Sequence, residues 1–252
     1  MRNKKITNTI EGAAITLSLL LLSSCNGLFD GVYDEPSEGN VSEGEYNPST
    51  RRGRIVVNAS TFDKWHYINL HDRSVTAMDV PTLLTGEWDG KSGITYHEVD
   101  LKNDTYTFKK LVKTDAMPEP SDWDFAVHKF DSRIKDGGAY ETEFTSLDDL
   151  PSASEFSNVV FTEDVWSENN VMTDISGMLS YYIGYQNSLS NPVLGRWLVM
   201  DITTPPPTYH PSGKVYIVRL HDGTMAALHL ANYISPNNLK GYLTIDYIYP
   251  YE

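Results

Sequence analysis

Alternating apolar and polar positions run through most of the chain from residue 54 onwards. Short segments with a period of two, rich in β-branched and aromatic residues, predict β-strands. Turn-forming sequences such as Asp136-Gly137-Gly138 and Lys240-Gly241 separate these segments. The predicted strands cover residues 54–60, 64–70, 93–101, 105–111, 122–130, 139–147, 158–166, 178–186, 195–202, 213–220, 224–233 and 242–250.

Helical periodicity contributes little to this region. Apart from a short turn predicted near residues 147–150, no amphipathic helix follows the N-terminal segment, and no repeat of fixed period is found. About 200 residues are enough to bury a sizeable core. The pattern therefore predicts one all-β domain, residues 54–252, with many short and mostly antiparallel strands in a sandwich or a strongly bent sheet.

The N-terminus has the order of an export signal. Arg2, Lys4 and Lys5 precede an apolar run at 13–22 that is too short to span a bilayer comfortably. The run ends in Leu22-Ser23-Ser24-Cys25, the pattern of a bacterial lipoprotein signal that is cleaved before the cysteine. Residues 1–25 are thus predicted to be a lipoprotein signal peptide, with Cys25 lipidated and anchoring the protein in a membrane. The alternative is an ordinary secretory signal with an incidental cysteine.

Residues 26–53 are rich in Gly, Ser, Asn and acidic residues, a composition that cannot bury a core and predicts a flexible acidic tether. Asp30, Asp34 and Glu35 follow the cysteine closely, as in the surface-export signals of some Gram-negative lipoproteins. The predicted location is therefore the outer membrane, with the domain lipid-anchored and exposed at the surface.

Charge and cysteine usage exclude several kinds of partner. Without residues 1–25 the chain has 17 Lys and Arg against 33 Asp and Glu, a net charge of −16. Such a surface repels nucleic acid and anionic lipid. Cys25 is the only cysteine, so its acylation leaves no thiol for a disulfide, a metal ligand or a nucleophile.

The sequence also lacks the motifs of an enzyme. It contains no Gly-rich phosphate loop, no paired-histidine zinc motif and no Gly-x-Ser-x-Gly elbow. The histidines, at 66, 71, 97, 128, 210, 221 and 229, are scattered singly. We therefore predict no catalysis. His128, in the apolar stretch 122–130, is better interpreted as a packed strand residue than as a ligand.

Several motifs together resemble the HmuY-like haem-binding lipoproteins, which are surface haemophores of Gram-negative anaerobes. These are the lipobox at Cys25, the strand Trp-Asp-Phe-Ala-Val-His-Lys-Phe-Asp at 123–131, Trp-Leu at 197–198, Pro-Thr-Tyr at 207–209, Lys-Val-Tyr-Ile-Val-Arg at 214–219, Asp-Gly at 222–223, Asn-Tyr at 232–233 and Lys-Gly-Tyr-Leu-Thr-Ile-Asp-Tyr-Ile-Tyr-Pro at 240–250. The segment 134–195 matches least clearly.

The resemblance implies a β-protein that holds haem as its cargo, with the iron coordinated by two His or two Met, and that passes the haem to an outer-membrane transporter. Apart from the haem iron, no metal is expected. Methionine thioethers are soft ligands that favour ferrous iron. The resemblance also assigns His128 to the framework rather than to the ligand pair.

The resemblance places one axial ligand at Ile202, which cannot bind iron, so Met200 on the same strand face is the substitute candidate. The other ligand falls in the segment Asn170-Val171-Met172-Thr173-Asp174-Ile175-Ser176-Gly177-Met178, where Met172 is preferred over Met178. Core packing is the alternative for each methionine. Further candidates are His210 as a ligand and Tyr181, Tyr182, Ile202 and Tyr209 as pocket-lining residues.

Two alternatives to a haem carrier remain open. The same fold could bind a glycan or another flat hydrophobic molecule on its Trp and Tyr rings. It could also be a structural or adhesive surface lipoprotein with no small ligand.

Overall fold

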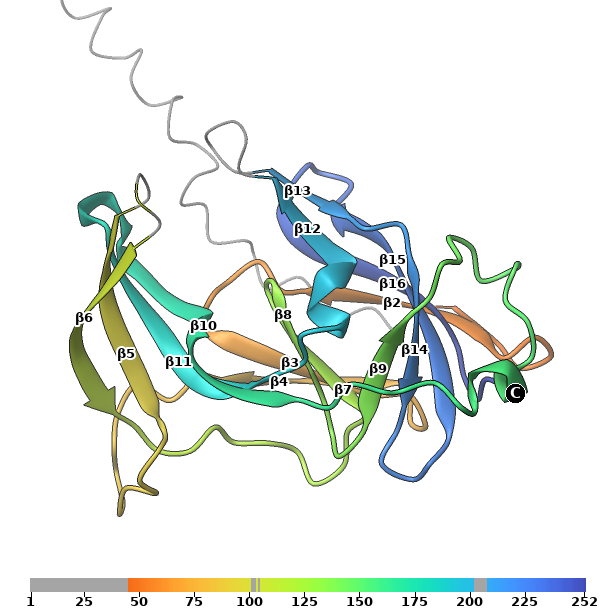
Figure 1. Ribbon diagram of the computed structural model, residues 1–252, viewed down its shortest axis with the longest axis horizontal. Coiled ribbons are helices and arrows are strands. Elements are labelled where there is room, and N and C mark those ends of the chain that lie inside the picture. Colours follow the sequence, from red (N-terminus) through yellow and green to blue (C-terminus); the bar gives the residue numbers. More distant parts are fainter. Residues whose placement is uncertain (1–44, 101–102, 104, 202–207) are drawn as a thin grey trace, which may run out of the picture. The chain divides into compact units, whose positions relative to one another are not determined.

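The computed structural model describes residues 45–252, except residues 101–102, 104 and 202–207. The all-β prediction is confirmed, because the described residues form antiparallel strands with only three short 3-10 turns between them (Figure 1). Within this described part, no helix is both long and apolar enough to span a bilayer.

A six-stranded sheet forms one layer of the domain. Its strand order is β1-β2-β16-β15-β14-β9, and every neighbouring pair is antiparallel. The strands are β1 (Tyr46–Asn47), β2 (Arg52–Asn58), β9 (Gly138–Glu141), β14 (Val215–Arg219), β15 (Met225–Ile234) and β16 (Lys240–Ile248).

A four-stranded sheet packs against it, in the order β4-β3-β7-β8. Alternation along β3 and β7 turns Ile68, Phe125 and Val127 toward the six-stranded sheet, where they share one buried cluster with residues of β2, β14, β15 and β16. This cluster is the main core, and two packed sheets of this kind form the predicted sandwich. The strands are β3 (Lys64–Asn69), β4 (Ser74–Asp79), β7 (Phe125–His128) and β8 (Asp131–Ile134).

A second four-stranded sheet, in the order β10-β11-β5-β6, extends from the sandwich at the left of Figure 1. Val171 of β10 joins the cluster of Trp65 and Tyr67, and the Trp65 indole N–H donates a buried hydrogen bond of 2.9 Å to Gln186 of β11. These contacts attach the sheet to the sandwich. Its strands are β5 (Gly93–Asp100), β6 (Thr105–Lys113), β10 (Val165–Gly177) and β11 (Tyr182–Ser190).

A two-stranded ribbon, β12 (Leu198–Asp201) and β13 (Thr208–Pro211), completes the fold. The turn η3 (Leu194–Trp197) precedes it, and Trp197 and Leu198 are buried in the main core. The Tyr209 ring stacks on Phe130 with 4.5 Å between centroids, so the ribbon is fixed to the sandwich near its base. The turns η1 (Ala153–Phe156) and η2 (Met178–Ser180) are the other helical segments.

Several predicted boundaries need correction. Strand β1 and the start of β2 lie inside residues 26–53, so the tether prediction is too long at its C-terminal end. Strand β10 covers residues 165–177 and not 158–166, because its bulges against β11 interrupt the alternation that sequence analysis relies on. The strands β4, β8 and β13 were not predicted, whereas the turn near residues 147–150 is present.

Replacing Trp65 with Phe tests the attachment of the second four-stranded sheet. The change removes the hydrogen bond to the buried Gln186 side chain, and leaving a buried polar group unpaired costs about 2 kcal/mol. Urea unfolding of Trp65→Phe should show a loss of this order. The control Trp166→Phe, at a half-buried ring covered by Lys91, should unfold close to the wild type. Equal stability of the two variants would contradict the account.

Candidate functional site

One face of the sheet β10-β11-β5-β6 is largely apolar, with buried side chains on β5 and β11 and exposed aromatic rings on β6. Cross-strand partners share a face, and His97 pairs with Ile183 of β11 and with Phe108 of β6. By the same rule, Tyr185 pairs with Met172 of β10. The face, here called the Met172 face, comprises Met172, Ile183, Tyr185, His97, Val99, Tyr106 and Phe108.

Met172, the preferred first ligand, lies on this face and is half-buried. It packs against the buried cluster of Val99, Ile183 and Tyr185. A thioether in an apolar, partly open setting can serve as a soft metal ligand or as a gap-filling core residue.

The other residues predicted around β10 and β11 do not share this surface. Tyr182 pairs with Glu98 and therefore points to the opposite face, where its ring stacks on Tyr96 at 5.2 Å. Met178 is 41% exposed in the turn η2, and Tyr181, which ends the turn with a positive φ of 56°, is 55% exposed. The structure therefore groups Met172, but not these three residues, with the apolar surface.

On the ribbon, Met200 pairs with Tyr209 and His210 pairs with Val199. Adjacent positions of a strand point to opposite faces, so Met200 and His210 lie on opposite faces of the ribbon. Met200 is 55% exposed, and the His210 ring lies 3.1 Å from the Pro211 carbonyl oxygen. Tyr209 is half-buried and contacts Phe130 and Tyr233, so it supports the ribbon. Ile202 lies outside the described residues.

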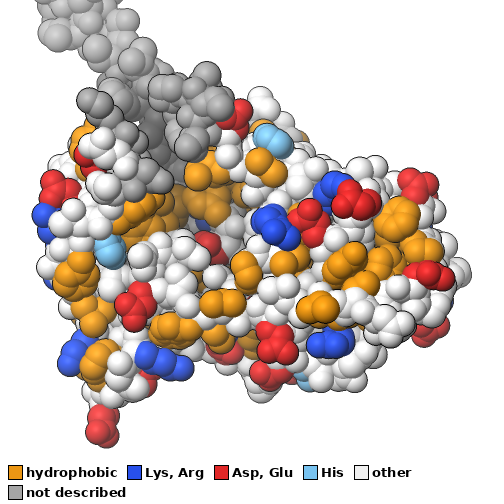
Figure 2. Space-filling view, viewed as in Figure 1, with side chains coloured by type: hydrophobic (Ala, Val, Ile, Leu, Met, Phe, Trp, Pro, Cys, Tyr) orange, Lys and Arg blue, Asp and Glu red, His pale blue; other side chains and the backbone are white. Residues whose placement is uncertain are grey.

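Figure 2 shows two gatherings of hydrophobic side chains on one face of the molecule, over the β10–β11 hairpin and over the β12–β13 ribbon, with a depression between them. The candidates Met172 and Met200 belong to these two elements. Among the described residues, no ring contact or shared hydrophobic cluster connects the two methionines.

Two hollows lie apart from the predicted iron ligands, and charged side chains are among the residues that line them. One, of about 1050 Å³, lies over β1 and β2 and is lined by Arg54, His229 and Asp246 among others. The other, of about 790 Å³, lies at the end of the β5–β6 hairpin beside Tyr181 and is lined by Glu98, Thr107 and Lys109 among others. Neither includes a predicted iron ligand.

His128 is a framework residue, as interpreted from the sequence. Its side chain is fully buried, with one ring nitrogen 2.8 Å from the Phe62 carbonyl oxygen and the other 3.4 Å from Asp131. The ring also packs beside Trp65, with 5.1 Å between centroids. Both nitrogens are therefore used within the core.

His97, which no sequence pattern singled out, is 7% exposed on the Met172 face. Neither of its ring nitrogens has a hydrogen-bond partner among the described residues. Burial lowers the pKa of His97, which favours the neutral imidazole. The alternation of Thr95, His97 and Val99 could have indicated its face, but not its neighbours on β11 and β10.

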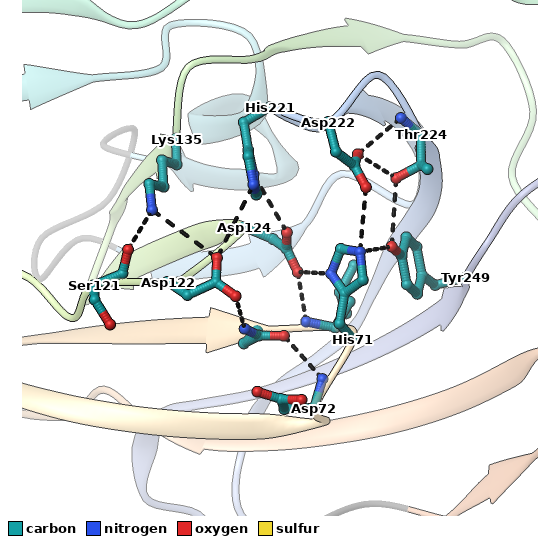
Figure 3. Close-up of polar contacts among 12 residues, drawn as sticks. His71, Asp72, Ser121, Asp122, Asp124, Lys135, His221, Asp222, Thr224 and Tyr249 are labelled. Carbon is teal, nitrogen blue, oxygen red and sulfur yellow. Dashed lines mark hydrogen bonds and ion pairs between the residues drawn. The ribbon is translucent and has the colours of Figure 1, made fainter.

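A cluster of titratable groups also lies between the two layers of the sandwich (Figure 3). The Asp124 carboxylate, 1% exposed, accepts the Leu70 backbone N–H at 2.6 Å and lies 3.5 Å from His71 and 4.0 Å from His221. His71 in turn contacts Asp222 at 3.2 Å. In the part of the chain that the structure describes, no group of His, Cys, Asp or Glu has the arrangement of a metal site. This cluster connects the loops of the two sheets.

The comparisons with known proteins agree with this fold. The family model described as HmuY protein matches residues 61–247, well over half of the chain. The chain belongs to the HmuY family. HmuY proteins form a haem-binding family and are not enzymes, so the prediction of a non-catalytic protein is confirmed through family membership.

Solved structures with a similar fold include relatives of this chain. A candidate HmuY-like haem-binding protein from Bacteroides vulgatus is 34% identical, with 82% of this chain and 96% of that chain covered and a TM-score of 0.61. A candidate lipoprotein from Bacteroides fragilis is 31% identical, with coverage of 86% and 99% and a TM-score of 0.64. The apo HmuY analogue from Tannerella forsythia shares the fold at 18% identity, coverage of 83% and 97% and a TM-score of 0.60. Curated protein sequences give no match.

The buried Asp124 carboxylate predicts a specific pH dependence of stability. Burial raises its pKa, and the hydrogen bond from Leu70 only partly offsets this effect. Between the unfolded pKa near 4 and the higher folded value, the folded protein holds more protons, so the contribution of Asp124 to stability falls as pH rises. The free energy of unfolding of the wild type, minus that of Asp124→Asn, should therefore decrease as pH is raised above about 4.

Asp222→Asn is the matched control, because the net pKa shift of Asp222 has the opposite sign. Partial burial raises its pKa, but hydrogen bonds from Thr224 and the contact with His71 outweigh this and lower it. The wild-type-minus-variant difference should then decrease as pH falls. Parallel curves for Asp124→Asn and the wild type would contradict the assignment.

Proposed function

We propose that this protein is a surface lipoprotein that binds haem between the Met172 face and the β12–β13 ribbon and delivers it to an outer-membrane transporter. Membership of a haem-binding family supports the choice of ligand. The observation that carries the proposal is the Met172 face, which offers a soft thioether within an apolar and partly open surface.

The residues present suit a porphyrin. Tyr106 is 49% and Phe108 is 57% exposed, so two aromatic rings are available to pack on a flat apolar ligand beside the buried Tyr185. Covering such rings removes apolar surface from water, at about 25 cal/mol per Å². A thioether and an imidazole are both established ligands of haem iron.

The pairing register of the β12–β13 ribbon limits which of its side chains can bind the iron on the side of the porphyrin opposite Met172. Because Met200 and His210 lie on opposite faces of the ribbon, only one of them can point toward the depression in a given arrangement. Met200 shares its face with Tyr209, which packs on the sandwich through Phe130. We therefore propose Met172 and Met200 as the iron ligands of reduced haem.

Membrane attachment is a separate part of the proposal. The lipobox pattern at residues 22–25 supports acylation of Cys25, and the relative from Bacteroides fragilis is itself a candidate lipoprotein. A tethered haem carrier without catalysis requires a receiver, and we propose an outer-membrane transporter for that role.

A haem titration tests the binding proposal. The domain comprising residues 26–252 should bind dithionite-reduced haem saturably and give the sharp, split bands of a six-coordinate iron. Met172→Leu, which keeps the packing volume but removes the sulfur, should weaken ferrous haem binding by about tenfold or more and change the spectrum.

Met225→Leu is the control, since Met225 is half-buried on β15 of the six-stranded sheet. It should leave both affinity and spectrum unchanged. Absence of saturable binding by the wild type in either oxidation state would overturn the haem proposal. Equal binding by Met172→Leu and the wild type would overturn the ligand assignment alone.

Lipidation is tested by changing Cys25 to Ser in the full-length chain, expressed in a Gram-negative host. The hydroxyl cannot form the thioether to diacylglycerol, so labelling with a radioactive fatty acid should be lost. The protein should also leave the membrane fraction. Persistent labelling of Cys25→Ser would contradict the proposed anchor.

A further inference from the structure

His97 combines two properties that are costly together. It is 93% buried, and both of its ring nitrogens lack hydrogen-bond partners among the described residues. An unpaired buried polar group costs about 1–3 kcal/mol. Thr173 of β10 also has an unpaired buried hydroxyl, but only His97 has two unpaired ring nitrogens in this sheet, and this cost points to a partner outside the described residues.

The surroundings of His97 are aromatic and can open. The Phe108 and Tyr185 rings lie edge-on to the imidazole, with centroids at 5.9 and 5.8 Å. Tyr185 is buried, but Phe108 is 57% exposed on β6, which is the edge strand of its sheet. Because Phe108 is mostly exposed, its side chain can rotate away from the imidazole without disturbing a core.

His97 and Met172 lie on the same face of the sheet, on the two strands that flank β11. Their partners on β11 are Ile183 and Tyr185, which are two positions apart. A planar ligand that covers this face would meet both side chains from one side. Only one of the two could then occupy the axial position on that side of a porphyrin.

We propose that His97 is the nitrogen ligand that this site offers to the iron of oxidised haem, in exchange for the Met172 sulfur that binds reduced haem. This inference rests on the proposed haem-binding function. The bond forms when a lone pair of the neutral imidazole is donated to the iron, so no proton has to leave. Imidazole binds both oxidation states of iron, whereas a thioether favours the softer ferrous ion.

His66 shows that unpaired nitrogens alone would not select His97. It is also buried without hydrogen-bond partners, and burial lowers its pKa to about 4. It lies on β3, however, between β4 and β7, and belongs to a different sheet from Met172. His97 is singled out because it shares the face of the thioether and is covered by an exposed ring.

The test compares the wild type with His97→Leu and His97→Gln in haem titrations in air and with dithionite. The wild type should bind ferric haem with a low-spin, nitrogen-ligated spectrum. Both variants should lose that spectrum and bind ferric haem about tenfold or more weakly, while their binding of ferrous haem changes by less than about threefold. Electron paramagnetic resonance of the ferric complex gives the ligand type independently of affinity.

His210→Leu is the competing variant, because His210 was the other candidate nitrogen ligand. Loss of the ferric spectrum in His210→Leu, with His97→Leu unchanged, would overturn the assignment. An unchanged ferric spectrum in both would overturn it as well. A wild type that binds ferrous haem only would refute the role of His97 while leaving the proposed function intact, whereas no binding at all would refute both.

Phe108→Ala provides a test that leaves His97 in place. The ring is largely exposed on an edge strand, so its removal should not unfold the sheet. If Phe108 covers the ligand, ferric haem should associate with the variant several times faster, measured by stopped-flow absorbance. An unchanged association rate would argue against access to His97 through this ring.

Discussion

The pairing register of β11 between β10 and β5 is the constraint on which the account of the site depends. Because side chains alternate strictly along a strand, this register decides which residues reach the same surface. It brings Met172, Tyr185, Ile183 and His97 to one face and turns Tyr182 to the other. A shift of one residue on β11 would exchange the apolar face for one that carries Tyr182, Gly184 and Gln186.

The sandwich holds this sheet in place through a small number of contacts. The main core between the six-stranded sheet and the sheet β4-β3-β7-β8 contains most of the buried apolar residues. The sheet β10-β11-β5-β6 is attached to the sandwich by Val171 and by the Trp65–Gln186 hydrogen bond. The ribbon is attached by the buried Trp197 and Leu198 and by the stacking of Tyr209 on Phe130. Two elements that carry candidate ligands thus extend from the packed sandwich, an arrangement that suits the proposed uptake and release of a flat cargo.

The sequence predicted the fold well, because a half-buried strand is recognisable from its own residues, as alternating apolar and polar positions between turn-forming residues. It located β2, β3, β5, β6, β14, β15 and β16 closely. It failed at β10, where bulges and polar residues hide the period, and at short strands such as β4 and β8. For the site, the resemblance selected Met172. It also grouped Tyr182 with Met172, because the sequence of one strand does not determine how that strand pairs with its neighbour. The same limit concealed His97, whose proposed role rests on its neighbours on β11 and on its unpaired nitrogens.

Methionine-methyl NMR tests directly whether haem lies against the Met172 face, as proposed. With the methionine methyl groups of the domain labelled with ¹³C, adding reduced, diamagnetic haem should shift the Met172 resonance strongly upfield, since the porphyrin ring current is largest above the iron. The Met78 and Met225 methyls, which pack in other clusters, should stay close to their original positions. An unshifted Met172 methyl in a haem-saturated sample would contradict the account.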